Sequence, residues 1–172
     1  MENISKSSRH SHITGSFAEA LVLYWLSRNG FECARIDHTG IDLIARNCYT
    51  DECMGISVKS RSRYKGTESG AVSCAITDYK KIDSACATFN CIAYHAIVVD
   101  TGNCIRMYLL TTEHFRSVAK AGSTKSHWGM TVKHLERYRN DPAIKTVELA
   151  VSAPRWWGRA EGKNLRPQRI KT

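Results

Sequence analysis

Three charged residues of this chain stand among apolar neighbours and have the types needed for hydrolytic chemistry. Glu19 lies in Phe17-Ala-Glu-Ala-Leu21, Asp42 in Ile41-Asp-Leu-Ile-Ala45, and Lys59 at the end of Ile56-Ser-Val-Lys59. Paired carboxylates and a backbone carbonyl can hold Mg²⁺, which lowers the pKa of a bound water and neutralises charge on a phosphate. A nearby lysine can orient the attacking water or stabilise that charge. The residue types therefore suit metal-assisted hydrolysis of a phosphodiester.

Strand periodicity indicates how two of these residues could meet. Successive side chains of a strand point to opposite faces, so Ser57 and Lys59 share one face while Ile56 and Val58 take the other. If the strand carrying Asp42 pairs with this one as a hairpin, Asp42 and Lys59 approach each other.

Each residue also has a purely structural interpretation. Ser16 and Glu19 match a capping box at the start of a helix. Asp42 follows Thr39-Gly40 and could simply end a turn. Lys59 could be a solvated lysine that protects a strand edge.

The surrounding pattern predicts the elements that would position these residues. We expect helices over 16–29, 78–88, 112–121 and 132–139, with Gly30 ending the first helix and Thr77 capping the second. We expect strands over 31–36, 41–46, 54–60, 92–100, 104–110 and 146–151, and loops over 67–70 and 120–129. A helix, a three-stranded meander, a second helix and a hairpin indicate an α/β fold, with one central mixed β-sheet flanked by helices.

Composition limits the class of protein. The chain has 172 residues, of which 42% are hydrophobic and 24% charged, which suits one folded domain and excludes intrinsic disorder. Apolar runs are too short to span a membrane, and the first twelve residues lack the apolar segment of a secretory signal. We therefore expect a flexible leader over 1–12, an α/β domain over 13–152, a basic tail over 153–172, and a cytoplasmic location. Seven cysteines without a CxxC pair favour reduced thiols over a zinc site.

The net charge of +9 favours a polyanionic partner, nucleic acid before a membrane surface. Residues 153–172 carry six basic residues and one acid, a net of +5. The candidate nucleic-acid-binding residues are a basic row in phase with Lys59 and a Trp-containing part of the tail: Arg61, Arg63, Lys65, Arg155, Trp156, Trp157 and Arg159. The alternatives are a solvated face and tryptophans that fold back onto the core.

Four segments, 15–19, 29–32, 40–45 and 55–60, resemble the PD-(D/E)XK nuclease superfamily, in its Holliday-junction-resolvase-like and restriction-endonuclease-like branches. That pattern is a helix bearing Glu, a strand opening with Asp, and a strand ending in an acidic or amide residue, any residue and Lys. The resemblance implies a Mg²⁺-dependent endonuclease, with Mn²⁺ as a substitute, acting on DNA. Because cutting a double strand or a junction needs two active sites, we also expect a symmetric homodimer. It also implies that Asp42, Glu19 and the Val58 carbonyl bind the metal and that Lys59 is catalytic.

One position departs from the superfamily pattern. Ser57 stands where the superfamily has an acidic or amide residue, and a hydroxyl is a weak, uncharged ligand for Mg²⁺. Asp37 is a conceivable replacement carboxylate, although it also suits a turn. Two alternatives to a nuclease follow: a nuclease-like module that binds nucleic acid without cutting it, and an interaction protein whose basic tail docks an acidic partner.

Overall fold

The computed structural model describes residues 6–152, apart from the side chain of Asp37. The predictions on Asp37 as a ligand and on Arg155, Trp156, Trp157 and Arg159 therefore lie outside the described part of the chain.

The described residues form four helices and nine strands, connected by turns and loops. The helices are α1 (His10–Arg28), α2 (Ile76–Thr88), α3 (Thr112–Val118) and α4 (Val132–Asn140). The strands are β1 (Phe31–His38), β2 (Ile41–Asn47), β3 (Cys53–Ser62), β4 (Val72–Ala75), β5 (Ile92–Asp100), β6 (Cys104–Thr111), β7 (Lys120–Ala121), β8 (Lys125–Trp128) and β9 (Lys145–Ala150).

Six of these strands form one mixed sheet in the order β1-β2-β3-β5-β6-β9. The pair β3–β5 is parallel and the other neighbours are antiparallel. A parallel pair needs a long crossover, and β4 and α2 lie in the segment that connects β3 to β5. The predicted α/β class, with a central mixed sheet between helices, is confirmed.

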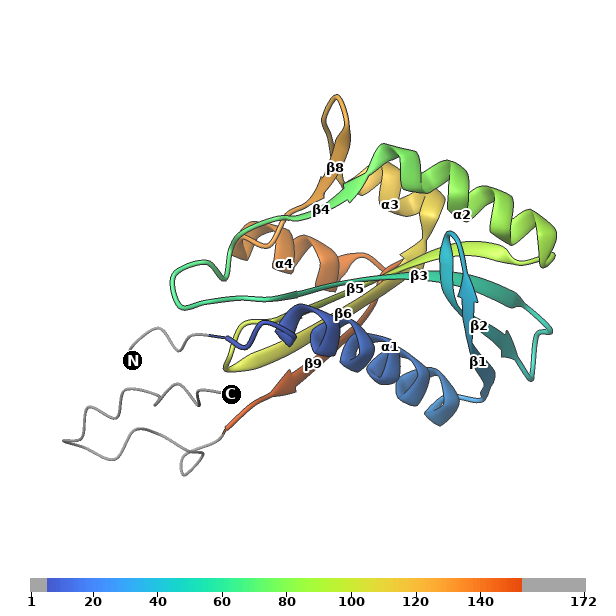
Figure 1. The fold of residues 1–172 in the computed structure, drawn as a ribbon, viewed down its shortest axis with the longest axis horizontal. Coiled ribbons are helices and arrows are strands. Elements are labelled where there is room, and N and C mark those ends of the chain that lie inside the picture. The colour runs from blue at the N-terminus through green and yellow to red at the C-terminus, as the bar shows by residue number, and fades with distance from the viewer. Residues whose placement is uncertain (1–5, 153–172) are drawn as a thin grey trace, which may run out of the picture.

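Helices cover the two faces of this sheet separately (Figure 1). Helix α1 buries Ala18, Leu21, Val22 and Leu26 against one face, in a cluster that includes Leu43 of β2. On the other face Ile82 and Ala85 of α2 form a second cluster. A third cluster joins residues of β5 and β6 to α3, α4 and the small sheet: Ile97, Val99, Tyr108, Leu110, Phe115, Trp128 and Tyr138. Successive residues along β2, and likewise along β3, point to opposite faces of the sheet. The position of a residue in its strand therefore determines whether its side chain points toward α1 or toward α2.

The predicted loop at 67–70 is confirmed, whereas the predicted loop at 120–129 is wrong in part because it contains the strands β7 and β8. Strands β4, β8 and β7 form a separate three-stranded sheet, and the hairpin of β7 and β8 projects from the body (Figure 1). Trp128 at the end of β8 is fully buried. Strands this short carry little periodic signal, and Gly122 and Gly129 at their borders favour a loop interpretation.

Helix boundaries also differ from the prediction. Helix α1 begins at His10, so the last residues of the expected leader are helical and Ser16 lies inside the helix. The proposed capping box of Ser16 and Glu19 is therefore wrong. Helix α2 begins at Ile76 with Ala75 as its N-cap, so Thr77 does not cap it. Gly30 follows α1 with a φ of +83°, as expected for a helix-ending glycine.

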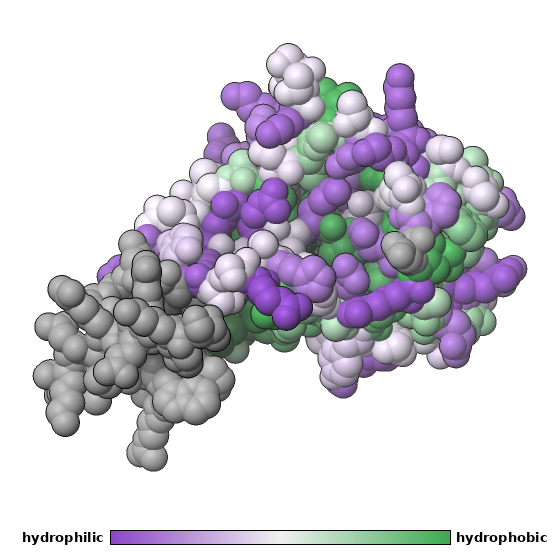
Figure 2. Space-filling model, viewed as in Figure 1, coloured by the Kyte–Doolittle hydropathy of each residue, from purple (hydrophilic) through white to green (hydrophobic). Residues whose placement is uncertain are grey.

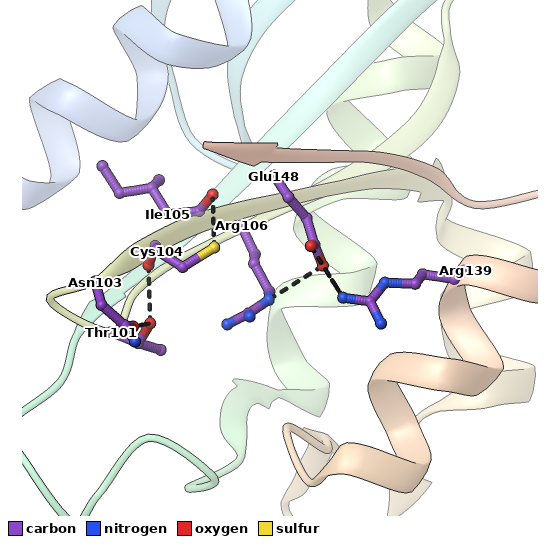
Figure 3. Close-up of polar contacts among 7 residues, drawn as sticks. All are labelled: Thr101, Asn103, Cys104, Ile105, Arg106, Arg139 and Glu148. Atoms are coloured by element: carbon purple, nitrogen blue, oxygen red, sulfur yellow. Dashed lines mark hydrogen bonds and ion pairs between the residues drawn. The ribbon is translucent and has the colours of Figure 1, made fainter. Parts of the chain in front are cut away.

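Glu148 of β9 joins three elements at the far edge of the sheet (Figure 3). It accepts hydrogen bonds from Arg106 Nε of β6 at 3.2 Å and from Arg139 Nη2 of α4 at 2.9 Å. Burial alone would raise the pKa of Glu148, but these two guanidinium groups lower it overall. These two ion pairs connect β6 and α4 to the edge strand β9.

The surface in view is mostly hydrophilic, with smaller apolar areas between the polar side chains (Figure 2). Among residues 6–152, no helix has the length and apolar character needed to cross a membrane.

Candidate functional site

A pocket of about 140 Å³ gathers three of the predicted site residues on one face of the sheet. Asp42, Ser57 and Lys59 line it together with Asp78 of α2. The antiparallel register of β2 and β3 brings Asp42 close to Ser57. Leu43 lies opposite Ile56, so Asp42, one residue before Leu43, adjoins Ser57, one residue after Ile56. The remaining lining residues are Thr39, Gly40 and Lys81.

Asp42 is held at the open end of the β2–β3 pair. Its Oδ2 accepts a hydrogen bond of 2.6 Å from the backbone N–H of Val58. Burial raises the pKa of the Asp42 carboxyl above its ordinary value of 3.8, and the Val58 bond and the charge of Lys59 only partly oppose this. The protein thus keeps a desolvated carboxylate in the pocket, in the environment that favours binding of a cation.

Asp78 is the site residue that the sequence reasoning missed. It lies in the first turn of α2, where a negative charge complements the helix dipole. Lys59 Nζ lies 3.2 Å from its Oδ2 and Lys81 Nζ lies 3.5 Å from its Oδ1. Burial would raise the pKa of Asp78, but the two ammonium groups lower it overall. Asp78 therefore stays ionised and holds Lys59 toward the pocket.

No short sequence motif predicts that Asp78 joins the site, because it lies nineteen residues after Lys59 and on a separate element. The available signal was an acid in the first turn of the helix that follows the lysine strand. Only the parallel return of β5 beside β3 brings that helix over Ser57 and Lys59.

Gly40 lets the turn before Asp42 lie against α2. Its φ of +112° favours glycine, and a Cβ at this position would overlap the backbone carbonyl of Lys81. The close approach places Thr39, Gly40 and Asp42 on the same pocket as α2.

A buried, neutral histidine on β5 lies next to the pocket. His95 of β5 lies beside Ser57 in the parallel register and is fully buried. Burial, aided by the charges of Lys59 and Arg116, lowers the pKa of His95 to about 4. Its Nδ1 is 2.9 Å from the Thr112 hydroxyl, and its ring stacks on Phe115. His95 therefore adds no charge next to Lys59 at neutral pH.

Glu19 is not brought to this pocket. Its carboxylate lies 3.6 Å from Arg35 Nε, and Arg35 also donates to the Ser16 carbonyl at 2.9 Å. Arg35 pairs with Leu43 in the sheet, on the face that α1 covers, whereas Asp42 is the next residue and points to the other face. In this arrangement the implied partnership of Glu19 and Asp42 is not formed.

The basic row beyond Lys59 divides into different environments. Arg61 is exposed on β3, and its Nη1 donates to the Ser60 carbonyl at 2.7 Å. Arg63 lies past the end of the strand and donates to the carbonyls of Gly70 and Ala71 at 2.6 and 2.9 Å. Burial lowers the pKa of Arg63, and Lys65 lies on the exposed loop that follows. The strict alternation expected over 59–65 therefore stops at Ser62.

The donor set of the pocket fits a divalent cation with few protein ligands. The carboxylates of Asp42 and Asp78 and the hydroxyl of Ser57 are hard oxygen donors, and Mg²⁺ is commonly held by one or two carboxylates, with waters and phosphates completing its shell. Among the described residues, no group of three or more His, Cys, Asp or Glu side chains is arranged to hold a metal. Any cation here would thus depend on waters or substrate oxygens for the remaining positions.

Comparisons with known proteins give a limited result. No family model matches the chain, and no curated protein matches its sequence. Among solved structures, its fold is similar to that of a Holliday junction resolvase from the archaeal hyperthermophile Archaeoglobus fulgidus. The sequence identity is 14%, the match covers 63% of this chain and 84% of that chain, and the TM-score is 0.47. A likeness at this level carries no argument about activity, so the functional reasoning rests on the pocket itself.

Proposed function

We propose that this protein is a metal-dependent endonuclease that hydrolyses phosphodiester bonds of DNA. The observation that carries the proposal is the single pocket that combines Asp42, Ser57, Lys59 and Asp78. Two carboxylates and two lysines give a charge-balanced site, in which the carboxylates suit a cation and the ammonium groups suit a phosphate.

The residues have separable roles in this proposal. A divalent cation held by Asp42 and Asp78 would activate a water and neutralise charge on the phosphate. Asp42 is oriented by the Val58 N–H, so one carboxylate oxygen is committed to the backbone. Lys59 is aimed by Asp78 and can donate hydrogen bonds to a phosphate oxygen as negative charge develops there.

Asp78 also offers an answer to the missing acid at position 57. In this proposal the carboxylate comes from the adjacent helix rather than from the strand, while the Ser57 hydroxyl completes the wall of the pocket. Ser57 is only 3% exposed, so the position has little room for a solvated acid.

A nicking assay tests the proposal. Wild type, Asp42→Asn and Lys59→Ala are compared on plasmid, single-stranded and branched DNA with Mg²⁺ or Mn²⁺. We expect wild type to cut at least one substrate and both variants to be severely impaired. If wild type cuts none of them, or if all three proteins cut equally, the proposal is wrong.

We further propose that the active form is a symmetric homodimer, because cutting two strands of DNA requires two active sites and twofold symmetry supplies them. Light scattering of the purified protein, alone and with DNA, measures the mass directly. A monomer under both conditions would contradict this part of the proposal.

A second candidate is a module that binds DNA without cutting it. Its support is the position of Glu19 with Arg35 and the lack of a three-ligand metal cluster in the described residues. Calorimetry with Mn²⁺ separates the candidates: salt-sensitive DNA binding without metal binding favours the module. A Mn²⁺ site that Asp42→Asn abolishes favours the endonuclease.

A further inference from the structure

A second, larger pocket lies on the opposite side of β3. It has a volume of about 370 Å³ and is formed by the start of α1, the segment before it and the end of β3. Ser60 and Ser62 line it, and they alternate with Lys59, so they point toward the α1 side of the sheet. The two pockets are therefore separate but lie within a few residues of each other along one strand.

The lining of this pocket has the chemistry of an anion site. Its three nitrogen-bearing side chains are Lys6, His10 and Arg61, and six more of its residues carry aliphatic hydroxyls: Ser7, Ser8, Ser11, Thr14, Ser60 and Ser62. None of the described lining residues is acidic. The Thr14 and Ser62 hydroxyls donate within the protein, to the His10 carbonyl and to Asp100. The Arg61 guanidinium and the other serine hydroxyls supply the hydrogen-bond donors that a phosphate with its several acceptor oxygens requires, and Lys6 adds a positive charge.

Lys6 is fixed in place by neutral acceptors. Its Nζ donates to the carbonyls of Ser62 and Arg63 at 2.7 and 3.2 Å and to the Ser62 hydroxyl at 3.0 Å. It also lies 4.1 Å from the centre of the Tyr64 ring. Lys6 is connected to the carboxylate of Asp100 only through Ser62, whose hydroxyl donates to Asp100 at 3.0 Å. Its ammonium is thus held without an ion pair among the described residues.

His10 adds a polar atom that the fold leaves unused. Its Nε2 is shielded from solvent and has no hydrogen-bond partner among the described residues. A buried nitrogen without a partner costs free energy. Because solvent does not reach this atom, His10 Nε2 makes no contact with a ligand of the pocket in the observed conformation, and the other lining residues supply the contacts to a bound anion.

We propose that this pocket binds a backbone phosphate of the nucleic acid on which the neighbouring site acts. The inference rests on the proposed function for the identity of the ligand, whereas the pocket and its charge stand independently. A bound phosphate would fix the register of the nucleic acid along β3 without reading its sequence.

Fluorescence anisotropy with a labelled DNA duplex in EDTA tests the pocket apart from cleavage. Ser11→Asp places a negative charge in the pocket, and Ser27→Asp is the matched control, because it makes the same change near the other end of α1. We expect Ser11→Asp to weaken binding by about tenfold or more and Ser27→Asp by less than about twofold. Equal affinities of the two variants would overturn the assignment.

The salt dependence gives a second readout. Lys6→Gln should reduce the slope of log affinity against log salt by about 0.9, the value for one phosphate contact, while Lys125→Gln on the β7–β8 hairpin should leave it unchanged. Thermal melts of both variants establish that they are folded. An unchanged slope for a folded Lys6→Gln contradicts the proposal.

A titration with inorganic phosphate, followed by backbone amide NMR, distinguishes the ligand sources. Shifts confined to residues 7–11 and 60–62, together with the loss of DNA affinity in Ser11→Asp, support a nucleic-acid phosphate site. Shifts without that loss indicate a site for small phosphates only and overturn the proposal. Failure of the proposed function is distinguishable, since wild type would then cut no DNA while Ser11→Asp would still weaken binding.

Discussion

Asp42→Asn should increase stability and abolish activity at the same time. Asn preserves the size of the side chain and can still accept the hydrogen bond from the Val58 N–H, so the change removes essentially only the charge. Burial raises the pKa of Asp42, which means that the folded protein holds its ionised form at a cost.

The sign of the pH dependence follows from this shift. The folded protein keeps the Asp42 proton to a higher pH than the unfolded chain does, so the free energy of unfolding falls as pH rises from about the ordinary value of 3.8 through the raised pKa. Above that window wild type carries the full cost, and Asp42→Asn carries none. At pH values below the window both proteins have a neutral side chain, and their stabilities should converge.

The expected gain at pH 7 is on the order of 1 kcal/mol, which is typical when a destabilising functional group is removed. For a chain of this size that corresponds to a rise in melting temperature of about 2–4 °C. The loss of activity should be larger, because charge stabilisation by a bound metal is worth several kcal/mol and each 1.36 kcal/mol is tenfold in rate. We therefore expect cleavage to fall by about a hundredfold or more.

Thermal melts between pH 4 and pH 8, paired with the nicking assay, measure both effects. Asp51→Asn is the control, since Asp51 is an exposed carboxylate whose pKa is lowered by its bond with Arg46. Asn also tolerates the positive φ at that position. We expect the control not to gain stability at pH 7 and to keep full activity. A less stable Asp42→Asn at pH 7, or a stability difference that is the same at pH 4 and pH 7, would show that burial of the ionised Asp42 carboxylate does not destabilise the fold.

Further variants test the neighbours of this carboxylate and the fold that holds it. Lys59→Ala should lower the cleavage rate by about 10²–10³-fold, as for loss of a preorganised donor, whereas equal loss in Lys81→Ala would contradict a special role for Lys59. Asp78→Ala should lower cleavage and tighten duplex binding in EDTA severalfold, because it leaves two ammonium groups without their carboxylate; weaker binding would oppose this. Gly40→Ala should lower the free energy of unfolding by about 1–3 kcal/mol in urea titrations, because of its positive φ and the Lys81 backbone, and no change would show that the turn can relax. Glu148→Gln should lower it by less than about 1 kcal/mol while leaving cleavage intact, and impaired cleavage would connect the far sheet edge to the site.

Sequence periodicity predicted the elements that carry long or regular patterns. The sheet strands, the helix over 78–88 and the approach of Asp42 to Lys59 were predictable, because alternation and turn residues determine which side chains share a face. The small sheet was missed, since strands of two to four residues next to glycines lack a periodic signal. The start of α1 was placed too late because Ser16 has the residue type of an N-cap, although it lies inside the helix.

The composition of the site was less predictable than its location. Asp78 became a neighbour of Lys59 only through the parallel pairing of β3 with β5, a long-range contact that no local motif encodes. Glu19 suited a carboxylate pair by residue type, but α1 covers the opposite face and Arg35 neutralises it. Which acids line the pocket therefore depends on the layer that each acid joins, and tertiary packing decides that.

Anomalous diffraction from crystals soaked in Mn²⁺ would locate a cation in the pocket without relying on turnover. We predict a manganese peak in the pocket between β2, β3 and α2, ligated by Asp42 and Asp78. The absence of a peak at a saturating Mn²⁺ concentration, or a peak ligated by Glu19 without Asp78, would contradict this prediction.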